Sequence, residues 1–234
     1  MEQIQIIEKL FYYIVTFSYL LIPISFFVSG SRKKGIIPLS LALYAIICCC
    51  FLFLYDFFKD DIRKDLRPYF QTSYTFFEYA IFTLIFWVNI KHKRIRRMIV
   101  VASVLFFAFQ LFYLLSGQVH RLDTVPIGIE TILILTYILY FFYEFSKKLD
   151  NFYIYNHYGF WIAVGVLIYL GGSFFFFIEF NLLTKDQRLA FGNMTYLAEI
   201  IKNILFSLAI FIYARYSFKN SDRKKPSMPY LDMI

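Results

Sequence analysis

The stretch from Ile36 to Phe57, IIPLSLALYAIICCCFLFLYDF, is apolar along almost its whole length and carries one charged residue, Asp56, near its end. The hydrocarbon core of a bilayer is about 30 Å thick, and an α-helix of about 20 residues is long enough to cross it. In a soluble domain, such a run would leave a large apolar surface facing water. The stretch therefore predicts a transmembrane helix.

Six further apolar stretches of similar length lie on either side of this one. They are Leu10–Ser29, Tyr69–Ile90, Met98–Gly117, Val125–Phe145, Tyr158–Ile178 and Thr195–Tyr216. The 234 residues are 60% hydrophobic, 23% aromatic and 17% charged, which excludes a soluble enzyme, a disordered tail and a disulfide scaffold. We expect an all-α integral membrane protein: a bundle of seven transmembrane helices in residues 1–216, followed by a short basic cytoplasmic tail in residues 217–234.

The positions of Lys and Arg indicate the orientation of this bundle, because cytoplasmic loops retain positive charge during membrane insertion. Most of the 24 Lys and Arg residues lie in alternate connections and in the tail: Arg32, Lys33, Lys34, Lys91, Lys93, Arg94, Arg96, Arg97, Lys147, Lys148, Arg215, Lys219, Arg223, Lys224 and Lys225. The other connections carry fewer basic residues, mixed with aspartates such as Asp60 and Asp61. The N-terminus is therefore predicted outside and the C-terminus in the cytoplasm.

The formal net charge of +8 raises the question of nucleic-acid binding, and the cluster KHKRIRR at residues 91–97 would be its main support. Retention of positive charge on the cytoplasmic side already explains that cluster. We therefore expect no nucleic-acid partner. The expected partner is the lipid bilayer, with weak attraction of the basic loops to anionic head groups.

Residue types that usually hold metals do not form a recognisable site. The cysteines are consecutive, from Cys48 to Cys50, and successive side chains on a helix point about 100° apart. The three histidines, His92, His120 and His157, are scattered among connections and helix ends. The sequence also contains no nucleotide-binding or hydrolase motif. We expect no metal, no cofactor and no enzyme of a known soluble type.

Several ionisable and amide side chains lie inside the predicted spans, where polar groups are costly and are candidates for function. Most fall in the outer half of the bilayer, about 6 to 13 Å from its outer edge. The candidate ligand-binding residues are Glu78, Gln110, Glu130, Ser173, Glu199, Lys202 and Asn203. Glu199 shares a helical face with Lys202, and Glu78 and Glu130 are its expected partners from other helices. Two interpretations stay open: bonds that hold the helices together, or an outward-facing polar pocket.

Small residues in the stretch from Tyr158 to Ile178 predict close helix packing. Gly165 and Gly172 are seven residues apart and share one helical face, which suits a close approach of a neighbouring helix. In the alternative interpretation, Gly171, Gly172 and Ser173 leave room for a ligand at the depth of the carboxylates.

Four segments carry a resemblance to a family: TFFEY at 75–79, GIETILIL at 128–135, FWIAVGVLIYLGGS at 160–173 and EIIKNIL at 199–205. They resemble a family of small seven-span membrane proteins from Bacteroidota, and the likeness covers most of the chain. The resemblance carries the family's pattern over to Glu78, Glu130, Trp161, Gly165, Tyr169 and Asn203. Members often have His where this chain has Glu199. The resemblance implies a bacterial inner-membrane location and a sensor kinase as partner, but it implies no particular chemistry.

These observations predict a receptor-like or sensory membrane module with an outward polar pocket. We expect the signal to pass through a separate partner or a homo-oligomer, because the residues after Tyr216 are too few for an output domain. The alternative is a small-solute or ion transporter or channel, which needs a polar route through the inner half of the bundle. A retinal protein using Lys202 and an intramembrane enzyme are further alternatives.

Overall fold

The computed structural model describes residues 2–30, 35–57, 67–115, 124–147, 154–179 and 182–223. These residues form seven α-helices and one short 3-10 helix, and no strand occurs among them. The elements are α1 (Glu2–Val28), α2 (Ile36–Phe57), α3 (Arg67–Asn89), α4 (Lys93–Leu115), α5 (Thr124–Ser146), η2 (Ile154–Asn156), α6 (Tyr158–Glu179) and α7 (Lys185–Arg223). The all-helical fold is confirmed.

The helix bounds lie within two residues of the predicted stretches for α2, α3, α5 and α6, whereas α1, α4 and α7 extend further. α4 begins at Lys93 instead of Met98, and α7 begins at Lys185 instead of Thr195. α2 coincides with the predicted stretch, whereas α1 begins at Glu2 instead of Leu10. α7 covers 39 residues and includes the predicted boundary at Tyr216. Glu, Gln, Lys and Arg are good helix formers, so a helix continues beyond its apolar segment when they flank it. His120 and residues 224–234 lie outside the described residues.

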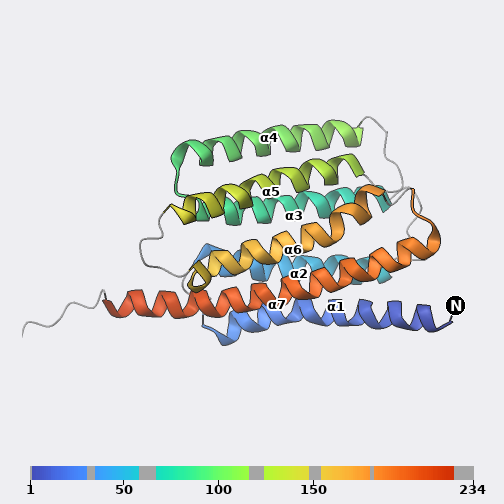
Figure 1. Ribbon diagram of the computed structural model, residues 1–234, viewed down its shortest axis with the longest axis horizontal. Coiled ribbons are helices and arrows are strands. Elements are labelled where there is room, and N and C mark those ends of the chain that lie inside the picture. Colours follow the sequence, from blue (N-terminus) through green and yellow to red (C-terminus); the bar gives the residue numbers. More distant parts are fainter. Residues whose placement is uncertain are drawn as a thin grey trace, which may run out of the picture.

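The helices lie side by side along the long axis of the molecule (Figure 1). α6 and α7 pack against each other, and α7 also packs on α1, which contacts α2. α3 is central to the other half, where it contacts α2, α4 and α5. The N-terminus lies at one end of the bundle, and α7 extends beyond its neighbours at the opposite end (Figure 1).

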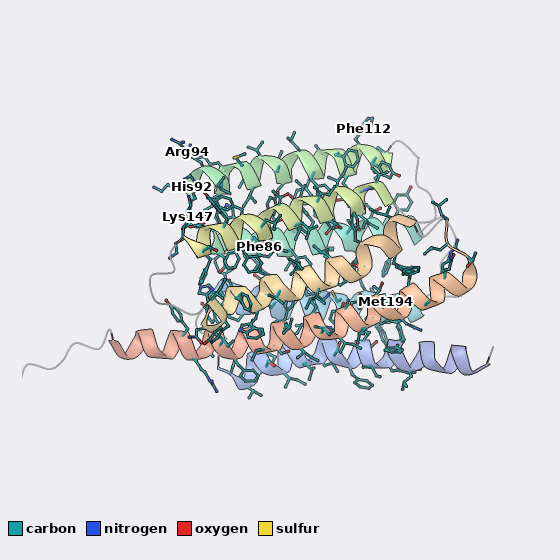
Figure 2. The ribbon with its side chains drawn as sticks, viewed as in Figure 1. Phe86, His92, Arg94, Phe112, Lys147 and Met194 are labelled. Carbon is teal, nitrogen blue, oxygen red and sulfur yellow. The ribbon has the colours of Figure 1, made fainter. Side chains whose placement is uncertain are left out.

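Many large apolar side chains face outward. Leu105 is 66% exposed, Phe112 is 72% exposed and Leu115 is 77% exposed. Figure 2 shows Phe112 on the outside of α4. Among the described residues, five helices are long and apolar enough to cross a membrane, and α6 contributes a shorter apolar segment, Tyr158–Phe174. Soluble monomers rarely expose this much apolar surface to water. These features therefore suggest a membrane protein.

Hydroxyl groups inside the helices bond to their own backbones. Ser40, Ser103, Thr131, Thr136 and Ser173 each donate to the carbonyl oxygen four residues earlier, at 2.7 to 2.9 Å. This bond satisfies a hydroxyl without a partner helix, as an apolar environment requires. These residues are therefore compatible with helices that contact lipid.

The predicted packing glycines lie between α6 and α7. A Cβ atom placed on Gly172 would be 2.7 Å from the Ala198 Cβ, and one on Gly165 would be 3.2 Å from the Phe206 ring. Trp161 lies in the first turn of α6, where its indole N–H donates to the Tyr155 carbonyl at 2.8 Å. Small side chains thus let α7 approach α6, whereas Trp161 fastens the preceding turn.

We expect Gly172→Ala to lower the melting temperature of the purified protein in detergent. The new methyl group meets Ala198, and overpacking of this kind costs about 1 to 3 kcal/mol. Gly171→Ala is the matched control, because no atom lies within 4 Å of its Cβ position and Ala is the better helix former. Ala198→Gly should restore stability to Gly172→Ala. Equal effects of the two glycine substitutions would contradict this packing.

His157 caps the start of α6. Its Nδ1 accepts a hydrogen bond from the Gly159 N–H at 3.1 Å, and its ring stacks on Tyr158 with 4.3 Å between the ring centroids. Burial, together with the positive charge of Lys91, lowers the pKa of His157 from 6.5 to about 4. Only the ring without a proton on Nδ1 can accept the capping bond. The fold therefore holds His157 in its neutral form.

This arrangement predicts a pH dependence of stability. The unfolded chain binds the His157 proton near pH 6.5 and the folded chain binds it near pH 4. The stability that neutral His157 contributes to the fold is therefore lost as the pH falls from about 6.5 to about 4. In melting curves recorded in detergent from pH 8 to about 4, the melting temperature of His157→Asn should fall less than that of the unsubstituted protein. Asn keeps a capping acceptor but does not titrate in this range. The exposed His92→Asn should follow the unsubstituted protein. Identical pH profiles for His157→Asn and that protein would refute the assignment.

Candidate functional site

Lys202 lies at the centre of the bundle and has no exposed surface. Its Nζ donates a hydrogen bond to the Tyr44 hydroxyl at 2.7 Å. The same nitrogen lies 3.8 Å from the ring centroid of Tyr169, 4.9 Å from that of Tyr44 and 5.4 Å from that of Tyr19. Aromatic faces attract cations through their quadrupole, most strongly where water is absent. Three tyrosines from α1, α2 and α6 therefore form an aromatic cage around the amine of α7.

The carboxyl group of Glu78 accepts hydrogen bonds from three tyrosine hydroxyls. Tyr44 donates to Oε1 at 2.8 Å, Tyr169 donates to Oε2 at 3.1 Å and Tyr74 donates to Oε1 at 3.4 Å. Because Tyr44 also accepts from Lys202, its hydroxyl bridges the amine and the carboxyl group. Three donors from α2, α3 and α6 therefore converge on one carboxyl group. We call these five side chains, Tyr44, Tyr74, Glu78, Tyr169 and Lys202, the tyrosine-bridged network.

Glu130 lies next to this network without joining its hydrogen bonds. It is 3% exposed, and its buried Oε1 has no hydrogen-bond partner. It lies close enough to Glu78 for the two carboxyl groups to interact electrostatically. A buried polar atom without a partner is costly, commonly by about 1 to 3 kcal/mol. Glu130 thus has unused hydrogen-bonding capacity, as do the buried Gln110 Oε1 and Asn203 Oδ1 atoms of two other candidate residues.

The expected pairing of Lys202 with a carboxylate is not a direct contact: Lys202 reaches Glu78 through the Tyr44 hydroxyl. No ion pair within 4 Å joins Lys202 to Glu78, Glu130 or Glu199, all of which the structure describes. Glu199 is half-buried one turn before Lys202 on α7, and the two side chains lie close enough to interact electrostatically without forming an ion pair. The Lys202 amine turns into the tyrosine cage instead, because the Tyr44 hydroxyl provides an acceptor and the rings fill the surrounding space.

The remaining candidates take no part in the side-chain hydrogen bonds of the network, and two of them, Asn203 and Gln110, join neighbouring helices. Asn203 donates to the Ser18 hydroxyl at 2.8 Å, which links α7 to α1. Gln110 donates to the Thr72 carbonyl at 3.1 Å, which links α4 to α3. Ser173 donates to the Tyr169 carbonyl of its own helix. The structure therefore brings Glu78, Glu130 and Lys202 together. Asn203, Gln110 and Ser173 instead bond to partners outside this group.

Sequence reasoning missed the tyrosines. Tyr169 was expected only in helix packing, and Tyr19, Tyr44 and Tyr74 were not singled out. The chain contains 20 tyrosines, so residue type alone does not distinguish these from tyrosines at a membrane surface. Their one distinguishing signal is depth: Tyr19 and Tyr44 lie well inside their apolar stretches, away from the interfaces where tyrosine is common.

Apolar residues close the network on the side of the basic helix ends. The rings of Tyr44, Phe82 and Phe206 form a cluster with centroids 5.1 to 6.2 Å apart. Ile85, Phe86 and Ile210 follow along α3 and α7, each 1% exposed. Among the described residues, the buried acidic and basic side chains are Glu78, Glu130 and Lys202. The charged layer therefore does not continue through this apolar layer.

The described residues contain no group of three His, Cys, Asp or Glu side chains that could hold a metal ion. Cys48 is a buried free thiol whose Sγ lies 3.9 Å from the Tyr74 hydroxyl, at the edge of the network.

Gln110 lines a hollow of about 210 Å³ between α3 and α4, together with Tyr69, Thr72, Ser73, Phe76, Phe77, Phe107, Leu111 and Leu114. This hollow does not include Glu78, Glu130 or Lys202.

We expect Lys202→Met to lower thermal stability strongly, by an amount equivalent to about 3 to 5 kcal/mol, because it leaves the Glu78 carboxylate buried without its cation. Adding Glu78→Gln should restore part of the loss. Adding Glu130→Gln, the matched control, should restore much less, since Tyr44 connects Lys202 to Glu78 and not to Glu130. Double-mutant cycles from melting curves in detergent measure both couplings. Equal rescue by the two substitutions would refute the bridge.

Comparison of the chain with protein-family models, with curated proteins and with solved structures gives no match.

Proposed function

We propose that the chain is a seven-span integral protein of a bacterial inner membrane, with its N-terminus outside and its C-terminus in the cytoplasm. Seven helices in the described residues, which run in alternating directions (Figure 1), and the apolar outer surface support this proposal. Basic residues support the orientation: Arg94, His92 and Lys147 lie at one end of the bundle (Figure 2). Arg96, Arg97 and Arg215 belong to the same end by their positions on α4 and α7.

Within this membrane setting, the protein acts as a receptor-like or sensory module. The observation that carries this proposal is the bridge from Lys202 through Tyr44 to Glu78. It links α7, α2 and α3, and Tyr169 adds α6. A ligand that competes for one of these hydrogen bonds therefore changes interactions among four helices simultaneously.

Glu130 is the proposed contact for such a ligand. Its partnerless oxygen favours a small polar molecule that donates a hydrogen bond from an ammonium, amide or hydroxyl group. Electrostatic interaction between Glu130 and Glu78 would transmit ligand binding to the tyrosine-bridged network. The ligand enters from the outer side, since Glu130 lies about one and a half turns from the outer end of α5.

The apolar layer favours a receptor over a transporter. An ion crossing the bundle needs polar groups along its whole route. Phe82, Phe86 and Phe206 are buried on the cytoplasmic side of the network, and the described part of the chain has no buried acid or base beyond them. Signal transfer then requires a partner, for which a sensor kinase or a second copy of the chain is proposed.

Purified protein in liposomes should show no proton, sodium or potassium flux above that of empty liposomes, because the apolar layer interrupts the polar route. Ion-sensitive dyes inside the liposomes provide the measurement. Flux that disappears in Glu78→Gln would replace the receptor with a transporter. A yellow to purple pigment lost in Lys202→Ala would instead indicate a retinal protein.

In cells, Glu130→Gln should abolish signalling while its membrane abundance stays normal. Transcript profiles of a deletion strain complemented with each variant provide the readout, and Glu130→Gln should resemble the deletion. Thr136→Val is the matched control on α5, because the exposed Thr136 bonds only to its own helix. A normal profile for Glu130→Gln would contradict the proposed ligand contact.

A further inference from the structure

A second feature lies at the basic end of α3 and α4, away from the tyrosine-bridged network. There the surface forms a groove with a volume of about 490 Å³. Its lining residues are Trp87, Lys93, Arg96, Arg97, Val100 and Val101. They comprise three cations, one aromatic ring and two aliphatic side chains, without an acid. The groove therefore combines positive charge with an apolar wall.

The cations of this groove occupy an electrostatically unfavourable position. α4 begins at Lys93, and the N-terminus of a helix carries a partial positive charge from its unpaired N–H groups. Lys93, Arg96 and Arg97 place further positive charge within the first turns, and the first turn contains no acidic residue. An anion at this point would neutralise both the side chains and the helix dipole.

Arg96 is held in place while part of its hydrogen-bonding capacity stays unused. Its guanidinium carbon lies 3.9 Å from the ring centroid of Trp87, which fixes the plane of the group against α3. Its Nε is buried and has no hydrogen-bond partner. Arg matches the oxygen atoms of a phosphate group well, because its N–H donors lie in one plane. Since the Nε does not contact solvent, the terminal N–H groups of the stacked Arg96 are the donors that would bind a phosphate oxygen in the groove.

The apolar wall indicates what else the ligand contains. Val100 lies seven residues beyond Lys93, so the groove extends about 10 Å along α4 toward the membrane interior. Val100 and Val101 are 49% and 58% exposed on the outer face of α4. A phosphate at the rim with a hydrocarbon chain along this wall satisfies both parts of the groove. Nucleic acids and acidic proteins offer no hydrocarbon chain for the wall.

We propose that this groove binds an anionic phospholipid, with its head-group phosphate at Lys93, Arg96 and Arg97 and an acyl chain along Val100, Val101 and the edge of Trp87. The proposal needs α3 and α4 to lie in a membrane, but it does not depend on the receptor activity. A failure of lipid binding would leave the proposed ligand contact at Glu130 untouched, and the reverse also holds.

The first test measures binding of phosphatidylglycerol to the purified protein in detergent by the rise in melting temperature during a lipid titration. Arg96→Gln and Arg97→Gln should each weaken the apparent affinity about fivefold, as expected for the loss of one interfacial cation. Arg94→Gln is the matched control: it removes the same charge from the same turn, but Arg94 does not line the groove. It should bind nearly as well as the unsubstituted protein.

Three outcomes of the titration overturn the proposal. Equal weakening by Arg94→Gln would mean a diffuse attraction to charge, without a defined site. An equal response to phosphatidylcholine would mean that the net charge of the lipid is irrelevant. An equal response to inorganic phosphate or glycerol phosphate would mean that the groove binds a free phosphate and not a lipid.

A second measurement does not depend on the stability of the arginine variants. The chain has two tryptophans, so Trp161→Phe leaves Trp87 as the only one. Phosphatidylglycerol with brominated acyl chains should quench Trp87 fluorescence in mixed micelles at least several times more strongly than brominated phosphatidylcholine at the same low mole fraction. Equal quenching by both lipids would refute a selective site beside Trp87.

Discussion

The burial of Lys202 is the constraint on which the centre of this structure depends. An amine without contact with water is costly in an apolar bundle unless its charge and its N–H groups are satisfied there. Tyr44 supplies the hydrogen-bond acceptor, three tyrosine rings supply negative faces, and Glu78 supplies the opposite charge through the Tyr44 hydroxyl. The charge and the N–H groups of Lys202 are therefore satisfied only with α1, α2, α3, α6 and α7 in these relative positions.

A bridging tyrosine has a different physical effect from a direct ion pair. A direct contact between Lys202 and Glu78 would join only α7 and α3, whereas the Tyr44 ring also fills the space between them and packs on Phe82 and Phe206. The bridge therefore couples electrostatics to aromatic packing. A change at the carboxyl group alters a hydrogen bond and the position of a ring together, which suits a switch between two helix arrangements.

Charged side chains are satisfied in two different ways in this bundle. Around Lys202, opposite charges lie inside the protein, and Lys202 and Glu78 are satisfied mainly by tyrosine hydroxyls from other helices. At the basic end, Lys93, Arg96 and Arg97 lie on the outer surface around the positive end of α4, and the first turn of that helix provides no acid. In the first arrangement Lys202 and Glu78 have partners within the protein and the Glu130 Oε1 does not, whereas the second is suited to an anion from the membrane. This difference separates the proposed ligand contact from the proposed lipid groove.

The sequence by itself determined the helices and the depth of their charged residues. Apolar length predicted α2 to the residue, and spacing along each helix placed Glu78, Glu130 and Lys202 at a similar level. Only the tertiary structure decided that Tyr44 joins Lys202 to Glu78, that Glu199 makes no ion pair with Lys202, and that Gln110 and Asn203 have packing partners elsewhere. The physical reason is that periodicity reveals which residues share a face of one helix, whereas a hydrogen bond between helices depends on how each helix is rotated toward its neighbour.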